Sequence, residues 1–150
     1  TRFITLSANT NESMPYHVVN KVVKAIAEQP VTLKDARVLI LGVAFKKNVK
    51  DLRHSPAEAI IQNLMKNGIS QVEYTDPWVP EYYAGGHTFT HVDLSAEMLA
   101  SYNCVVVVTD HDDFDAEFVA KHSLKIVDTR NMMQHVKTDR DKIVLLGSSL

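Results

Sequence analysis

The sequence predicts an α/β fold of three layers with a mainly parallel sheet, and three observations lead to this class. Short apolar runs typical of buried strands alternate with segments whose apolar residues recur at helical spacing. One run, Cys104–Thr109, contains four consecutive valines, as in strands covered on both faces. Residues that favour turns and helix ends separate the segments. Strands that alternate with helices pair in parallel through right-handed crossovers, so a Rossmann-like arrangement is expected.

A connecting helix is expected ahead of the first strand. Residues 1–11 show no clean period, and the polar residues Asn11 and Ser13 look like a break before the helix. From Pro15, which suits a first helical turn, to Pro30, the apolar residues follow a helical period. The residues on this apolar face are Tyr16, Val19, Val23 and Ile26.

The next pair of elements is a strand over Arg37–Phe45 and a helix over Ala57–Asn67. Ser55 can cap the start of this helix, and Glu58, three residues later, would complete a capping box. Gly68 fits the stop at the other end. The helix boundaries are therefore specified by the sequence on both sides.

The rest of the chain continues the alternation. Short helices are expected over Ser95–Tyr102 and Ala116–His122, the second capped by Asp115. Residues 78–91, which contain two adjacent glycines, are expected to form an irregular loop. The remaining strands are expected over Val72–Thr75, Cys104–Thr109, Leu124–Val127 and Lys142–Leu146.

Polar residues follow each of the first four strands. In a parallel sheet the carboxyl ends of the strands lie along one edge, and ligands bind outside that edge. We therefore expect these side chains to share one rim of the molecule. In chain order they are Lys46 and Arg53, Asp76, Asp110 and His111, and Asp128, Thr129 and Arg130.

The loop after the first strand carries four cations, Lys46, Lys47, Lys50 and Arg53, and it leads into a helix N-terminus. That combination suits a phosphate group. A dinucleotide fingerprint would need G-x-G-x-x-G here, and this loop offers only Gly42. A phosphate would therefore be held by side-chain cations and the helix dipole. A merely solvated basic loop explains the same spacing.

Arg130 follows the fourth strand, where its planar guanidinium could reach an anionic ligand. An intramolecular ion pair with Asp128 or Asp51 is an equal alternative.

Other chemistry is disfavoured. His87 and His91 have helical metal-ligand spacing, but they sit in a glycine-containing loop with no third ligand. The acidic run beginning at Asp110 lacks the glycine and the terminal glutamate of a calcium loop. Cys104, the only cysteine, starts a buried strand and is expected to be a core residue.

Length and composition set further bounds. A chain of 150 residues is by default one domain, and its net charge of −2 argues against bulk nucleic-acid binding. One cysteine allows no internal disulfide and fits a reducing compartment. No apolar run approaches the roughly 20 residues that cross a bilayer, and the N-terminus shows no signal-peptide pattern.

The motifs together resemble a known family. The segment 42–56, G-V-A-F-K-K-N-V-K-D-L-R-H-S-P, resembles the C-terminal UDP-binding domain of the UDP-glucose/GDP-mannose dehydrogenase family. The S-P ending and Val49 look more like the UDP-N-acetyl-mannosamine and UDP-N-acetyl-glucosamine 6-dehydrogenase branch. Four further segments agree in order: N-x-x-M-P at Asn11–Pro15, D-P at Asp76-Pro77, T-x-H at Thr109–His111 and D-x-R-N at Asp128–Asn131.

The resemblance implies roles for single residues. Phe45 and Lys46 match positions that contact the nucleotide sugar, and Arg130 matches another substrate contact. Arg53 matches a position that reaches NAD. Cys104 does not lie in the family's catalytic cysteine motif, so no residue of this chain is expected to be catalytic. No metal-binding residue is expected either.

It also implies an organisation. Residues 1–30 would be the end of a central-domain linker with the connecting helix, and residues 31–150 the UDP-sugar-binding C-terminal domain. Because the chain begins at Thr1 and lacks a glycine-rich NAD site, we expect a detached part of a longer protein.

The implied activity belongs to the whole enzyme. Such cytoplasmic oxidoreductases of polysaccharide biosynthesis oxidise a sugar C6 hydroxyl to a carboxylate with NAD. Here NAD would be bound mainly by a domain absent from this chain. The expected partners are a UDP-sugar and the missing N-terminal and central domains, within a homo-oligomer, without nucleic acid or membrane. The isolated chain is expected to be inactive. A free-standing, non-catalytic nucleotide-binding module and an unrelated Rossmann-like fold without a phosphate site are the alternatives.

Overall fold

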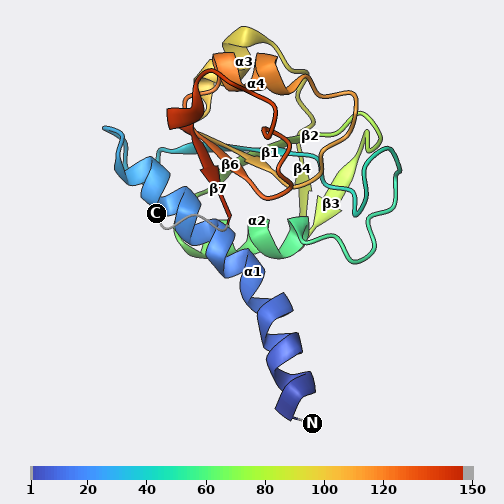
Figure 1. Ribbon diagram of the computed structural model, residues 1–150. Coiled ribbons are helices and arrows are strands. Elements are labelled where there is room, and N and C mark those ends of the chain that lie inside the picture. Colours follow the sequence, from blue (N-terminus) through green and yellow to red (C-terminus); the bar gives the residue numbers. More distant parts are fainter. Residues whose placement is uncertain (1, 147–150) are drawn as a thin grey trace.

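The computed structural model describes residues 2–146, with side chains described from Met14 onward. Five parallel strands form the central sheet, in the order β2-β1-β5-β6-β7. Helices α1 and α2 cover one face and α3 and α4 the other, which confirms the three-layer α/β class (Figure 1). The sheet strands are β1 (Arg37–Leu41), β2 (Gln71–Thr75), β5 (Cys104–Val107), β6 (Ile126–Asp128) and β7 (Ile143–Leu145). The helices are α1 (Arg2–Ala27), α2 (Ala57–Lys66), α3 (Ala96–Ser101), α4 (Ala116–His122) and the short 3₁₀ helix η1 (Arg140–Lys142).

The two core layers follow from the alternation of side chains along each strand. On β1, Val38 and Ile40 pack toward α1 and α2, whereas Leu39 and Leu41 pack toward α3 and α4. All four are fully buried. Burying one such side chain contributes about 1.5–3 kcal/mol, so both faces of the sheet need a helical cover.

Helix α1 is longer than the sequence predicted. It begins at Arg2 rather than at Pro15, which lies inside it. Proline removes one backbone hydrogen bond from the helix interior and often kinks it, yet here the helix continues on both sides of the ring. The polar residues before Pro15 have only modestly unfavourable helix propensities and do not end a helix by themselves.

Strand β1 is shorter than predicted and ends at Leu41 instead of Phe45. Gly42 turns the chain with φ = +83°, a conformation that favours glycine. A Cβ at this position would lie 2.5 Å from the carbonyl oxygen of Thr109. The glycine therefore lets the end of β1 pass close to the end of β5.

The capping box predicted for α2 is wrong. The Ser55 hydroxyl accepts a hydrogen bond from the Ala57 amide at 3.2 Å, but the Glu58 carboxylate turns away. It accepts instead from the Gly85 amide at 3.1 Å. The predicted stop is confirmed, since Gly68 follows α2 with φ = +96°.

The segment 78–91 is not the irregular loop that the sequence predicted. It holds an antiparallel hairpin of β3 (Tyr82–Ala84) and β4 (His87–Phe89). Gly85 and Gly86 connect the strands, both with positive φ, as a type I′ turn requires. The Glu58 contact ties this turn to α2.

Capping residues locate the two helices on the other face. Asp115 accepts from the Phe118 amide at 3.2 Å, and α4 has the predicted bounds. Ser95 accepts from the Met98 amide at 3.1 Å, one residue before α3 begins. Within residues 2–146, no helix combines the length and apolar character needed to cross a membrane.

Candidate functional site

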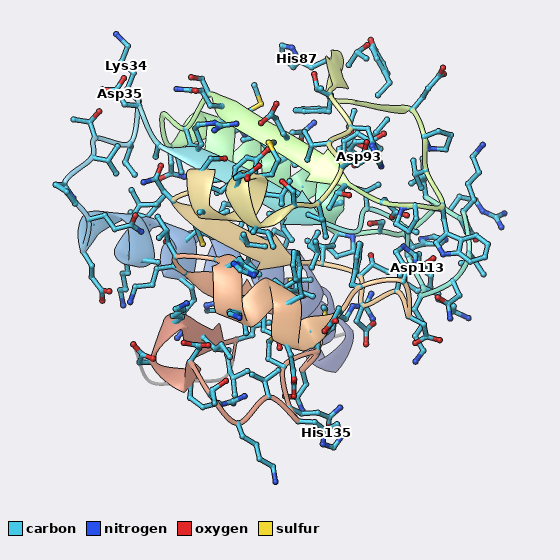
Figure 2. All side chains as sticks on the ribbon, turned by 90° about the horizontal axis from the view of Figure 1, so that it is seen from above. Lys34, Asp35, His87, Asp93, Asp113 and His135 are labelled. Carbon is cyan, nitrogen blue, oxygen red and sulfur yellow. The ribbon has the colours of Figure 1, made fainter. Side chains whose placement is uncertain are left out.

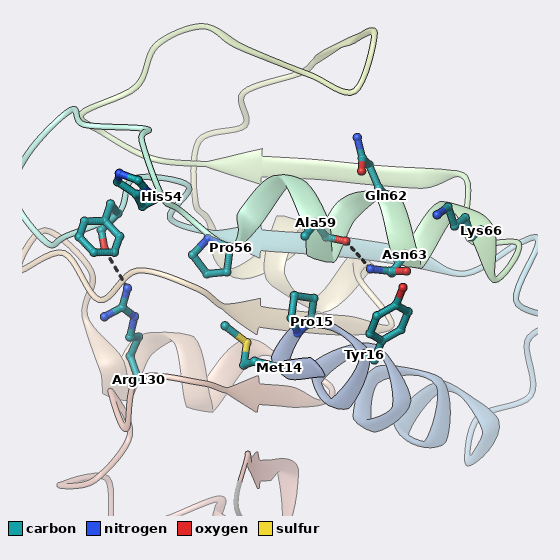
Figure 3. Close-up of a pocket in the computed structure, with 11 residues that line it drawn as sticks. Met14, Pro15, Tyr16, His54, Pro56, Ala59, Gln62, Asn63, Lys66 and Arg130 are labelled. Atoms are coloured by element: carbon teal, nitrogen blue, oxygen red, sulfur yellow. Dashed lines mark hydrogen bonds between the residues drawn. The ribbon is translucent and has the colours of Figure 1, made fainter. Parts of the chain in front are cut away.

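A pocket of about 880 Å³ lies along α2, between this helix and the part of α1 around Pro15 (Figure 3). It begins at the end of α2 that follows the basic loop and extends toward Lys66 (Figure 3). Its size is that of a small-molecule site. The lining residues are Met14, Pro15, Tyr16, Phe45, His54, Pro56, Ala59, Gln62, Asn63, Lys66 and Arg130.

Among the residues with described side chains, 14–146, the pocket is lined by basic side chains and by no acidic ones. His54, Lys66 and Arg130 are its titratable bases. Pro56 places it beside the N-terminus of α2, where the first-turn amides have no intrahelical partner and the helix dipole is positive. The electrostatic character of the pocket therefore suits an anion.

Phe45 and Arg130 meet at one end of this pocket. The Arg130 guanidinium donates from Nη2 to the Phe45 carbonyl oxygen at 2.8 Å and from Nε to the Val108 carbonyl oxygen at 2.9 Å. Three of its five N–H groups make no hydrogen bond to residues 14–146. The side chain is thus held by backbone carbonyls rather than by Asp128 or Asp51, and it keeps donors for a ligand.

The backbone of Arg130 is fixed by its neighbour. The buried carboxylate of Asp128 accepts from the amides of Arg130, Met132 and Met133, at 3.0, 3.1 and 2.8 Å. The segment from Asp128 to Arg130 therefore forms a turn that hydrogen bonds to the aspartate hold in place. The arginine side chain extends from this turn to the pocket.

Lys46 lies next to the pocket but is not among its lining residues. Its ammonium is 5.8 Å from the centroid of the Phe45 ring, whose residue does line the pocket. Because the lysine side chain is exposed and long, it can turn toward a ligand held over that ring.

Arg53 is not among the residues that line the pocket. Its guanidinium donates two hydrogen bonds to the Asp51 carboxylate, at 3.0 and 3.1 Å, and the Arg53 side chain is 83% exposed. Arg53 beside it holds the pKa of the Asp51 carboxyl at about 2, mainly through the side-chain hydrogen bond. Asp51 is in turn next to Phe45, whose amide donates to the Asp51 carbonyl at 2.7 Å, so Arg53 lies near the loop backbone without lining the pocket.

Sequence reasoning missed His54, Lys66 and Asn63. The His54 ring lies edge-on to Phe45, with centroids 6.2 Å apart, and its φ of +63° turns the chain there. Asn63 donates to the Ala59 carbonyl at 2.8 Å, as Figure 3 shows, which orients the amide along the pocket wall. The helical spacing of Ala59, Asn63 and Lys66 shows that they share one face of α2. That this face lines a pocket follows only from the position of α1.

A buried acid–base pair supports the loop between β1 and α2. The side chains of Asp76 and His111 are fully buried, and Asp76 Oδ2 lies 2.9 Å from His111 Nε2. The same oxygen accepts from the amides of Val43 and Ala44, at 2.8 and 3.2 Å. His111 Nδ1 lies 2.7 Å from the amide nitrogen of Asn48.

Trp78 borders this pair. Its indole Nε1 donates at 3.0 Å to Asp113, which is labelled in Figure 2, and its ring centroid is 6.3 Å from that of His111. The Trp78 amide donates to the second oxygen of Asp76 at 2.8 Å.

The remaining candidates have structural roles. Cys104 is fully buried, and burial raises the pKa of its thiol to about 12, so the predicted core role is confirmed. His91 packs edge-on against Tyr74, with ring centroids 5.2 Å apart. No cluster of three or more metal-ligating side chains occurs in the described part of the chain.

The turn after β1 does not fit a dinucleotide pyrophosphate. In a dinucleotide site, glycines leave room there for the pyrophosphate to approach the backbone. Here the open side of Gly42 is filled by Thr109, whose Cβ lies 2.6 Å from an added Cβ. The Thr109 hydroxyl donates to the Ala44 carbonyl and closes this turn further.

Comparison with known proteins finds relatives of one kind, the nucleotide-sugar dehydrogenases. Residues 39–135 match the UDP-binding domain of the UDP-glucose/GDP-mannose dehydrogenase family. A UDP-N-acetyl-D-mannosamine dehydrogenase of Methanococcus maripaludis is 31% identical over 89% of this chain and 31% of its own length. A UDP-N-acetyl-D-glucosamine 6-dehydrogenase of Pseudomonas aeruginosa is 31% identical over 69% of this chain and 24% of its own length.

Solved structures agree in fold. The crystal structure of NDP-N-acetyl-D-galactosaminuronic acid dehydrogenase from Methanosarcina mazei has a TM-score of 0.73 at 27% identity, over 94% of this chain and 30% of that one. UDP-D-ManNAc dehydrogenase from Pyrococcus horikoshii also has a TM-score of 0.73, at 23% identity, over 97% and 33%. The chain thus spans about a third of the length of its relatives.

Proposed function

The chain belongs to the UDP-glucose/GDP-mannose dehydrogenase family through its UDP-binding domain, and on this premise we propose that its pocket binds the UDP part of a nucleotide sugar. The whole protein would be an NAD-dependent UDP-sugar 6-dehydrogenase that acts on a UDP-N-acetylhexosamine. The relatives from Methanococcus maripaludis and Pseudomonas aeruginosa, both named for N-acetylated sugars, support that choice of substrate.

One observation carries the proposal. Phe45 and Arg130 follow different strands, yet the guanidinium of one bonds the carbonyl of the other in a single pocket. Arg130 supplies positive charge, and the N-terminus of α2 adds its dipole. A diphosphate at this end would extend the base or the sugar along α2 toward Asn63 and Lys66.

The chemistry itself would take place outside this chain. Oxidation of a C6 hydroxyl to a carboxylate removes four electrons and therefore consumes two NAD⁺. Because Thr109 fills the turn where a dinucleotide would sit, we assign NAD to another part of the protein. We propose that Arg53 contacts NAD that is bound mainly by another part of the protein.

Calorimetric titration of the 150-residue chain with UDP, UMP and uridine tests the binding proposal. UDP should bind most tightly and uridine least, and the affinity for UDP should fall as salt is raised, because the pocket attracts the diphosphate through exposed cations. Equal affinities for the three compounds, or no heat with UDP, would contradict the proposal.

A second assay tests the division of labour. The chain alone, mixed with NAD⁺ and a UDP-N-acetylhexosamine, should produce no NADH above the blank. NADH formation by the purified chain would show that it contains the catalytic machinery, contrary to the assignment.

A further inference from the structure

We propose that His111, together with Asp76, is a positioning residue that holds the segment 43–48 in its ligand-binding shape. This inference rests on the proposed function, because the segment carries Phe45 into the nucleotide pocket. It assigns a role to two buried polar side chains that do not line the pocket themselves.

The first step concerns Asp76. Its Oδ2 atom receives the Val43 and Ala44 amides and faces His111 Nε2, while Oδ1 receives the Trp78 amide. Four donors surround a carboxylate that has no exposed side-chain surface. Such a buried carboxylate is retained only when its oxygens are satisfied, so it fixes the start of the loop firmly.

The second step assigns the proton on His111. The backbone amide of Asn48 can only donate, and it points at Nδ1 from 2.7 Å. Nδ1 therefore accepts, and the proton of the neutral ring lies on Nε2, where it is donated to Asp76. A second proton on Nδ1 would face the Asn48 N–H and break that contact.

The third step links the pair to the pocket. The pair holds the chain at Val43 and Ala44 on one side and at Asn48 on the other, with Phe45 between them. The Phe45 carbonyl, which accepts from Arg130, lies between these fixed points, and the Phe45 amide also donates to the Asp51 carbonyl at 2.7 Å. The Asn48 side chain reinforces the far end by exchanging hydrogen bonds with Asp112, at 2.8 and 3.0 Å.

Three substitutions separate the two contacts of His111. In His111→Asn the side-chain oxygen lies near the former Nδ1 and keeps an acceptor for Asn48. In His111→Gln the amide reaches the former Nε2 and keeps a donor for Asp76. His111→Phe removes both. Leu99→Ala, in the core on the α3–α4 side of the sheet, lowers stability without touching the loop and is the matched control.

UDP titration and NMR hydrogen exchange on the 150-residue chain measure the effect, and thermal melting checks the control. UDP titration should give a Kd raised about tenfold in His111→Gln, the effect of losing the hydrogen bond from Asn48, and at least as much in His111→Phe, which loses both contacts. In His111→Asn it should stay within about threefold of wild type. NMR hydrogen exchange at the Asn48 amide should accelerate at least about tenfold in His111→Phe and His111→Gln. It should change little in His111→Asn. Leu99→Ala should melt at a lower temperature with its UDP affinity unchanged.

The outcomes are distinct from those of the proposed function. If wild type does not bind UDP, the proposed function fails. Hydrogen exchange at the Asn48 amide then still tests whether His111 positions the loop. Unchanged exchange in His111→Phe and His111→Gln overturns the positioning role. Wild-type UDP affinity in these variants, or an equal loss in Leu99→Ala, overturns it as well. If His111→Phe does not fold, the comparison of His111→Asn with His111→Gln decides the matter.

Discussion

The guanidinium of Arg130 donates a hydrogen bond to the carbonyl oxygen of Phe45 at 2.8 Å, although 85 residues separate the two in the chain. A second bond, to the Val108 carbonyl at 2.9 Å, fixes the plane of the guanidinium. The arginine thus connects the ends of three strands, β1, β5 and β6, at the edge where ligands bind parallel sheets.

Replacement of Arg130 should weaken UDP binding. Arg130→Ala removes both the positive charge and the support of the Phe45 carbonyl, and we expect the Kd to rise about tenfold or more, about 1.4 kcal/mol. Arg130→Lys keeps the charge without the fork and should recover only part of the loss. Calorimetry with UDP measures the change. Lys137→Ala, at an exposed residue outside the pocket lining, should bind as wild type does.

Lys46 and Arg53 should differ although both belong to the basic loop. Lys46 lies against a pocket residue, whereas the fork of Arg53 is occupied by Asp51. Lys46→Ala should raise the Kd for UDP several-fold at low salt, and Arg53→Ala should leave it unchanged. A reversed order of the two variants in the same titration would mean that the loop turns its other side to the ligand.

Gly42→Ala should be much more damaging than Gly86→Ala, even though both glycines have φ = +83°. A Cβ at Gly42 would collide with Thr109, while a Cβ at Gly86 would meet nothing within 4 Å. We expect a loss of about 2–4 kcal/mol in the first case and about 1 kcal/mol in the second. Urea unfolding of both variants gives the values. Equal losses would show that the close approach of β1 and β5 is not rigid.

Cys104 should be chemically inert in the folded protein. Burial raises the pKa of its thiol to about 12, so at pH 8 it is protonated as well as inaccessible. Iodoacetamide should leave the native chain unlabelled and label it fully in denaturant, as mass spectrometry can measure. Rapid labelling of the native chain would contradict the burial.

The same thiol should contribute to alkaline destabilisation. In the unfolded chain it ionises near its ordinary pKa of 9.0, whereas the folded thiol stays neutral up to about pH 12. Its contribution to stability is therefore complete below pH 9 and is lost as the pH rises toward 12. At pH 10 the expected loss is about 1 kcal/mol. Urea unfolding at pH 8 and 10 should show this loss in wild type and a smaller one in Cys104→Ala.

Local signals in the sequence predicted the fold where they agreed with tertiary packing. Helix α4 has its predicted bounds because Asp115 caps its first turn. Glu58 shows the opposite case, since its carboxylate bonds to the Gly85 amide and not to its own helix end. No rule of sequence spacing contains that contact, which depends on where the hairpin folds back. The hairpin itself was missed although Gly85-Gly86 between short apolar runs is a known turn signal.

The candidate site was predictable in part. The rule that parallel strands end at one edge placed Arg130 on the same rim as the loop after the first strand, and the family resemblance added Phe45. The structure shows these two residues in contact. The wall formed by α1 and α2 was not predictable, because it depends on how the two helices pack. For this reason His54 and Lys66 were missed. The Arg53 guanidinium, which was expected on the shared rim, is paired with Asp51 and does not line the pocket.

The position of Trp78 gives the molecule a built-in optical reporter. It is the chain's one tryptophan, its amide binds Asp76, and its ring lies beside His111. Indole fluorescence responds to nearby polar groups and to water, so a change in the hold on the basic loop would alter the emission without any added dye. Stopped-flow mixing can therefore follow events at the loop on the millisecond scale in the unmodified protein.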